Sequence, residues 1–154
     1  MTYRITGLSP EPFAPLFALD AAALATRNAE RVTATTNPGF PCRISMEDAE
    51  PGEELILLHH VSHDVATPYR SAYAIYVRQG VASATYVDTV PPVMVNRPIA
   101  LRGFDASGRL KAASLAAPGT ADAAIRTLFA ADDIAYIHAH NAAHGCFAAR
   151  VDRT

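Results

Sequence analysis

The strongest constraint on the fold is an alternation of polar and apolar residues near the end of the sequence. It runs through 134–140 and 146–151, and the segment 141–145 separates the two runs. Successive side chains of a strand point to opposite faces, so the alternation predicts a β-hairpin with one polar and one apolar face. Asn141 and Gly145 suit the turn, because asparagine starts turns through its side chain and glycine accepts a positive φ.

The polar face of this hairpin concentrates the chemically active side chains. With 141–145 as the connection, the expected cross-strand pairs are His140 with Cys146, His138 with Ala148 and Tyr136 with Arg150. The other face carries apolar side chains alone, namely Ile137, Ala139, Phe147, Ala149 and Val151. A slip of one residue would place polar groups opposite apolar ones, so the pattern favours this register. We therefore predict that imidazole, thiol and guanidinium groups share one face while the other face packs on the core.

The rest of the sequence is typical of short strands with a few helices. Strands are expected at 3–8, 43–46, 54–61, 71–78, 81–87, 99–104 and 109–115. Apolar residues on both faces of 54–61 place that strand in a sheet interior. Short helices are expected after Ser9-Pro10 and at 21–29, and a longer one at 121–130 with Thr120 as its cap. This pattern predicts an α+β fold with a mostly antiparallel sheet, in a single domain covering 1–154.

Composition and charge argue against several classes of partner. The formal net charge is -2 and no basic stripe is present, so nucleic-acid binding is not expected. No apolar run approaches the ~20 residues of a membrane helix, and the N-terminus lacks the pattern of a signal peptide. We therefore expect a cytoplasmic protein, in which Cys42 and Cys146 are reduced thiols rather than a disulfide.

Metal binding is one chemical interpretation of the hairpin. His138 and His140 lie two residues apart on one strand, so their rings project side by side. His144 or Cys146 would supply a third ligand, and imidazole with thiolate suits zinc or another transition metal. The alternative is a pair of histidines that are hydrogen-bonded to neighbours on a partly exposed sheet face, and spacing alone does not separate the two.

A second histidine group and the thiol give further interpretations. His59 and His60 point to opposite faces of a strand, so at most one of them could share an ion with His63-Asp64. Cys146 beside a histidine has the ingredients of a thiolate–imidazolium nucleophile. The alternatives are solvated histidines at a strand end and a buried, inert cysteine.

Anion binding is a fourth interpretation, and it rests on arginine. The arginines beside segments expected to be ordered are Arg43, Arg70, Arg102 and Arg150. If two or more converge, they form a fork for carboxylate or phosphate, with Tyr69, Tyr73 or Tyr136 as a wall. Otherwise they pair with Glu53, Asp64, Asp105 and Asp152 as structural salt bridges. A buried arginine needs a partner, which makes burial the property that separates these outcomes.

Five short segments, spread over nearly the whole chain, form a recognisable set. They are 38–43 (PGFPCR), 51–53 (PGE), 68–70 (PYR), 101–105 (LRGFD) and the terminal HN, GCF and VDR within 140–153. As a set and in this order, they resemble the bacterial proteins of the domain of unknown function 1203 family. The resemblance implies one compact bacterial domain, and it carries over no activity, substrate or cofactor.

Three functions are therefore expected from the residues themselves. The leading prediction is a domain that binds a small anionic ligand in a pocket lined by Tyr136, His138, His140, Cys146 and Arg150, with Arg43, Arg70 and Arg102 as further ligand-binding candidates. The second is a metal-dependent enzyme that uses His138 and His140. The third is a structural or interaction module, in which a second subunit of a homodimer covers the histidine face. No catalytic residue is assigned.

Overall fold

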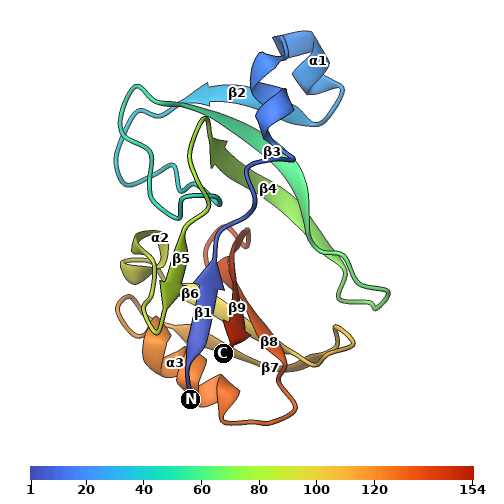
Figure 1. Cartoon of the computed structure of the whole chain (residues 1–154), viewed down its shortest axis with the longest axis vertical. Coiled ribbons are helices and arrows are strands. Elements are labelled where there is room, and N and C mark those ends of the chain that lie inside the picture. The colour runs from blue at the N-terminus through green and yellow to red at the C-terminus, as the bar shows by residue number, and fades with distance from the viewer.

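The computed structural model describes residues 1–154 and contains two antiparallel sheets (Figure 1). The larger sheet has six strands in the order β5-β1-β9-β8-β6-β7, and the smaller has three in the order β2-β3-β4. The larger sheet consists of β1 (Tyr3–Thr6), β5 (Thr85–Val87), β6 (Ile99–Phe104), β7 (Leu110–Ala116), β8 (Tyr136–Asn141) and β9 (Phe147–Arg153). The smaller sheet consists of β2 (Ala29–Thr33), β3 (Glu54–His63) and β4 (Ser71–Arg78).

Short helical segments complete the fold. They are the 3-10 helix η1 (Ala14–Ala18), α1 (Ala21–Ala25), α2 (Pro92–Val95) and α3 (Ala121–Phe129). The α+β class with mostly antiparallel strands is confirmed, as are the short N-terminal helices and the helix in the C-terminal half. None of the helices combines the length and the apolar character that a membrane span requires.

The main core lies between one face of the larger sheet and α3. Ile125 and Phe129 of α3 are buried in the same cluster as Ile137 of β8 and Val151 of β9. The smaller sheet has a core of its own, because η1 and α1 cover one of its faces. As expected from its apolar residues on both faces, β3 is the central strand of that sheet.

Two expectations for the first third of the chain are wrong. The helix expected at 21–29 ends at Ala25, because Asn28 takes a positive φ of 51° and the chain turns into β2. The strand expected at 43–46 is a turn instead, in which Met46 also has a positive φ. Isolated bridges flank this turn, and one of them joins Cys42 to Tyr76 of β4 in parallel orientation.

One smaller expectation near a helix start also needs correction. Thr120 precedes α3, but its hydroxyl donates to the carbonyl of Ala117 and forms no side-chain cap. α2 begins at Pro92, since a proline at the first helical position lacks only an N–H that would have no partner there.

Candidate functional site

The closing hairpin forms as expected, but its register differs. β8 and β9 pair so that His138 lies opposite Arg150 rather than Ala148. Next to the turn the register shifts between Ala139 and His140, where β9 contains one extra residue. The partner of His138 is thus two residues later than expected, for two reasons. The turn is one residue shorter than expected, because Asn141 pairs with Cys146, and the β-bulge moves every later partner by one more residue.

The bulge also changes which side chains of β9 meet the histidines. The ring of Phe147 lies 5.1 Å from that of His138 and 6.0 Å from that of His140, centroid to centroid. The expectation that Phe147 belongs to the apolar face is therefore wrong. Cys146, expected opposite His140, lies before β9 begins and is directed toward Arg43 instead.

Tyr136, His138 and His140 do share one face of β8, but that face is closed by the chain itself. All three side chains are buried. Nε2 of His63, from β3, lies 2.7 Å from the hydroxyl of Tyr136, and Nδ1 lies 2.9 Å from the carbonyl of Tyr69. A carbonyl only accepts, so Nδ1 carries the proton and Nε2 accepts from the hydroxyl. Tyr136 and His138 line none of five cavities of the protein, whereas His140 lines one of them together with Arg70 and Arg102.

Burial keeps both hairpin histidines neutral. It lowers the pKa of His138 from 6.5 to about 3, and the neighbouring His63 and His140 act in the same direction. Burial also lowers the pKa of His140 to about 4, although the hydrogen bond between its Nδ1 and the carbonyl of Gly145 opposes the shift. Nδ1 of His138 is buried and has no hydrogen-bond partner. His138 is thus a packed ring rather than an acid or base at neutral pH.

The expected metal ligands are not brought together. No group of three or more His, Cys, Asp or Glu side chains is arranged to hold an ion. The rings of His138 and His140 lie 6.4 Å apart. His144 lines one cavity together with His140 and another together with Cys146, but His138 lines neither. The geometry therefore gives no support to zinc or another transition metal at these residues.

The second histidine group is also dispersed. His59 is exposed, and His60 packs its ring edge-on against Phe13. His63 belongs to the buried cluster on β8, whereas Asp64 is exposed. These side chains form no common site.

Two of the candidate arginines are in surface salt bridges. Nε of Arg70 donates to Asp64 at 3.0 Å, and Nε of Arg150 donates to Asp152 at 2.8 Å. Such exposed pairs contribute about 0–1 kcal/mol and leave little positive charge for a ligand. Arg102 forms no ion pair and lines a cavity with a volume of about 450 Å³.

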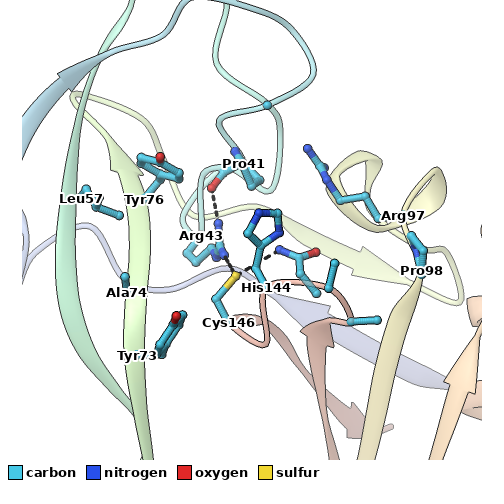
Figure 2. Close-up of a pocket in the computed structure, with 14 residues that line it drawn as sticks. Pro41, Arg43, Leu57, Tyr73, Ala74, Tyr76, Arg97, Pro98, His144 and Cys146 are labelled. Atoms are coloured by element: carbon cyan, nitrogen blue, oxygen red, sulfur yellow. Dashed lines mark hydrogen bonds between the residues drawn. The ribbon is translucent and has the colours of Figure 1, made fainter.

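Arg43 differs from these, because its guanidinium is buried at the base of a cavity between the two sheets (Figure 2). The residue is only 3% exposed. Nε donates to the carbonyl of Phe147 at 2.7 Å, Nη1 donates to the carbonyl of Pro41, and Nη2 donates to Sγ of Cys146 at 3.1 Å. Arg43 forms no ion pair with any carboxylate.

The charge of Arg43 therefore has no carboxylate counter-ion within the chain. Burial lowers the pKa of its guanidinium, and Arg97 acts in the same direction, whereas Cys146 and Cys42 oppose the shift. Arg97 itself is neutralised, since it donates to both oxygens of Asp48 at 2.7 Å and 3.0 Å. An arginine keeps its proton even when buried, so the cavity next to Arg43 is electropositive.

The cavity has a volume of about 390 Å³, which is in the range of small-ligand sites. Five parts of the chain line it: the segment from Gly39 to Arg43, Leu57 of β3, the edge of β4, Arg97 with Pro98, and the hairpin turn from Asn141 to Cys146. Tyr73 and Tyr76 of β4 also line it, and they lie on opposite faces of that strand (Figure 2).

Asn141 adds an unused acceptor to this site. Its Nδ2 donates to Sγ of Cys146 at 3.4 Å, while its Oδ1 is buried without a hydrogen-bond partner. The residue is only 8% exposed. Buried polar atoms are nearly always hydrogen-bonded, so an acceptor left over beside a cavity indicates a place for a ligand or a water.

Cys146 lacks the base that a thiolate–imidazolium nucleophile requires. Its sulfur accepts from Arg43 and Asn141, and no histidine lies within hydrogen-bond distance of it. Cys42 is fully buried and accepts hydrogen bonds from backbone N–H groups, among them that of Arg78. Both cysteines are free thiols.

The pocket expected from the sequence and the observed cavity share few residues. Cys146 belongs to both, and Arg43 was among the arginine candidates. The expectation did not include Asn141 as a ligand-binding residue, and it did not place the edge of β4 beside the hairpin turn. Two of the family-like segments, 38–43 (PGFPCR) and 140–147 (HN to GCF), could have indicated this site, because residues from both line the cavity.

Comparison with known proteins gives one match. A family model described as "Protein of unknown function (DUF1203)" matches residues 39–153, so every residue that lines the cavity lies within the match. No curated protein and no solved structure matches the chain.

Proposed function

The chain belongs to the family described as "Protein of unknown function (DUF1203)", and we propose that it binds a small ligand through a carboxylate in the cavity next to Arg43. The observation that carries this proposal is a buried guanidinium without a carboxylate partner. A carboxylate is its best counter-ion, because the guanidinium presents parallel N–H donors that match the two oxygens. A ligand would thus provide the partner that the chain does not.

Arg43 keeps donors for such a ligand. Its hydrogen bonds to Phe147, Pro41 and Cys146 use one N–H on each nitrogen. Each terminal nitrogen therefore retains a second N–H. The hydrogen bonds already formed hold the plane of the guanidinium in place, so little side-chain entropy is lost when a ligand binds.

The lining selects the chemical class of the ligand. Within this cavity only the guanidinium of Arg43 lacks a carboxylate partner, because Arg97 is already occupied by Asp48. One free positive charge suits a monocarboxylate better than a multiply charged phosphate. Leu57, Tyr73 and Tyr76 provide apolar and aromatic surface around the rest of the cavity. We infer a ligand with a small apolar body and one acidic group.

The other expected functions receive less support. The histidines lie apart, which disfavours a metal-dependent enzyme. The histidine face is closed by His63 and Phe147 of the same chain, so a second subunit is not needed to cover it. Two free thiols support the inference of a reducing, cytoplasmic setting.

Calorimetric titration with matched acids and amides tests the proposal. Benzoate and phenylacetate are compared with benzamide and phenylacetamide, which have similar shapes but no charge. We expect the acids to bind and the amides to bind at least ~10-fold more weakly, since a hydrogen bond to a charged group contributes about 1.5–3 kcal/mol. Equal binding of acid and amide, or no binding of either, would contradict the proposal.

A pair of variants locates the effect. Arg43→Gln removes the charge in the cavity, and Arg150→Gln removes an exposed charge that lines none of the larger cavities. We expect the first variant to lose the preference for acids and the second to retain it. Because Arg43 also joins two loops, the circular dichroism spectrum of each variant is compared with that of the parent protein.

A further inference from the structure

One edge of β4 lacks a neighbouring strand along most of its length. β4 pairs with β3 on one side, and on the other side only an isolated parallel bridge joins Tyr76 to Cys42. Unpaired strand edges carry rows of backbone donors and acceptors that can pair with another chain. In an antiparallel pair, the backbone N–H and carbonyl of each residue of β4 point either toward β3 or toward the free edge.

The pairing of β3 answers this for Ala74. His59 lies opposite Ala74, and its N–H donates to the carbonyl of Asn28 at 3.0 Å on the far side of β3. The His59–Ala74 pair is therefore the kind that shares no hydrogen bonds, and both backbone groups of Ala74 point away from β3. Tyr76 agrees, because its carbonyl accepts from the backbone N–H of Arg43 at 3.0 Å on the same free edge.

Ala72 has the same orientation, since it is two residues from Ala74 and lies opposite Val61 before the irregularity in β3. No backbone hydrogen bond outside the strand ladders involves either alanine. Both residues are only partly exposed. The free edge thus offers two N–H groups and two carbonyls at a spacing of about 6.6 Å, as a paired strand would.

The space beside these groups is continuous with the site of Arg43. Ala74 lines the cavity that contains Arg43, and Ala72 lines the cavity of about 450 Å³. Tyr73 and His144 line both cavities, so the two adjoin along the edge of β4. The hairpin turn forms the opposite wall (Figure 2).

We propose that the ligand is the C-terminal end of an extended peptide, whose carboxylate binds Arg43 while its preceding residues pair with the free edge of β4. This proposal rests on the carboxylate site proposed above and names the class of ligand. Adding a strand to a sheet edge is a common mode of peptide recognition, in which backbone hydrogen bonds provide affinity.

The positions of the groups set the direction of the peptide. Arg43 lies toward the Tyr76 end of the edge, where the chain segment at Cys42 already runs parallel to β4. A peptide with its carboxylate there must extend back toward Ala72. It therefore runs parallel to β4, in line with the segment that occupies the end of the edge.

Peptides of increasing length test this on the full chain by calorimetry. The series is N-acetyl-alanine, the N-acetylated dipeptide and the N-acetylated tripeptide, each with a free C-terminal carboxylate. We expect the tripeptide to bind at least ~5-fold more tightly than N-acetyl-alanine, as two further hydrogen bonds at about 0.5–1.5 kcal/mol each imply. Methylation of the peptide's amide nitrogens should remove that gain, because the carbonyls of the edge lose their donors.

Two variants of one edge residue test the protein side. Ala74→Pro removes an outward N–H and no ladder bond, a change that edge strands tolerate. Ala74→Ser keeps the N–H. We expect the proline variant to bind the tripeptide no better than N-acetyl-alanine while it still binds benzoate, and the serine variant to match the parent.

The outcomes separate this inference from the function on which it rests. If the tripeptide binds no better than N-acetyl-alanine, or if N-methylation has no effect, the peptide proposal is overturned and the carboxylate site stands. If neither peptides nor benzoate bind in preference to their amides, the carboxylate site itself is wrong. The methylated peptides give this answer even if Ala74→Pro does not fold.

Discussion

Acid should unfold this protein through His138 and His140, and the effect follows from their burial. An unfolded imidazole has a pKa of about 6.5, whereas burial lowers the native values to about 3 and about 4. Between these values the unfolded state binds more protons than the native state. The contribution of the two neutral histidines to the free energy of unfolding is therefore complete above pH ~6.5, and it decreases as the pH falls through this window.

The magnitude is large compared with the stability of an ordinary domain. One pKa unit corresponds to about 1.4 kcal/mol, so His138 alone removes about 5 kcal/mol by the pH at which its native form titrates. His140 removes about 3 kcal/mol more. Within the window each group contributes a slope of about 1.4 kcal/mol per pH unit. Domains of this size are stable by roughly 5–15 kcal/mol, so these two histidines together remove about half of that stability or more.

The assay is urea unfolding, followed by circular dichroism at a series of pH values between about 5 and 7.5. The parent protein is compared with His138→Leu, His140→Leu and the double variant. Leucine has a similar volume and does not titrate, so packing defects displace a curve at every pH without changing its slope. Below pH ~6.5 we expect each single variant to lose about 1.4 kcal/mol per pH unit of slope and the double variant to lose both, whereas above it the slopes should agree. An unchanged slope in His138→Leu would refute the reasoning.

Three further outcomes follow from single positions. Asn141→Asp should weaken binding of benzoate by at least ~10-fold in calorimetry, because Asn141 and Arg43 both donate to Sγ of Cys146, so a carboxylate at 141 would compete with the ligand for the guanidinium. Gly7→Ala should destabilise the protein by about 3 kcal/mol or more in urea unfolding, since the added Cβ would lie 1.9 Å from the carbonyl oxygen of Ile44. A thiol reagent should modify Cys146 before Cys42 in the native protein, as mass spectrometry would show, because Cys146 lines the cavity and Cys42 is fully buried. Benzoate should slow that modification.

The alternation of polar and apolar residues predicted which side chains of a strand share a face, but not where a bulge interrupts the strand. The alternation in β8 correctly placed Tyr136, His138 and His140 on one face and the apolar residues on the core. The bulge in β9 was not visible, because Ala148 and Ala149 are chemically identical and either suits either face. The helix expected at 21–29 was too long for a related reason. Alanines favour a helix, and the pairing of β2 with β3 overrode that preference.

The candidate site depends on contacts that no local pattern encodes. Arg43 and Cys146 are separated by 103 positions, and each lies in a short irregular segment without periodicity. The sequence marked both residues as candidates but placed Cys146 with the histidines. The position of Cys146 next to Arg43 depends on the packing of the two sheets, which leaves the edge of β4 beside the hairpin turn. That packing is a property of the whole chain.

The most direct test of the account observes the guanidinium of Arg43 itself. In a nuclear magnetic resonance spectrum of the nitrogen-15-labelled protein, the side-chain Nε–H of Arg43 should be sharp and protected from exchange, because it is buried and donates to Phe147. The signal is identified by its loss in Arg43→Gln. Titration with benzoate should shift it in proportion to the fraction bound and leave the signal of Arg150 in place. A saturable heat of binding without any change at Arg43, or with the change at Arg150, would contradict the claim that this buried charge is the binding site.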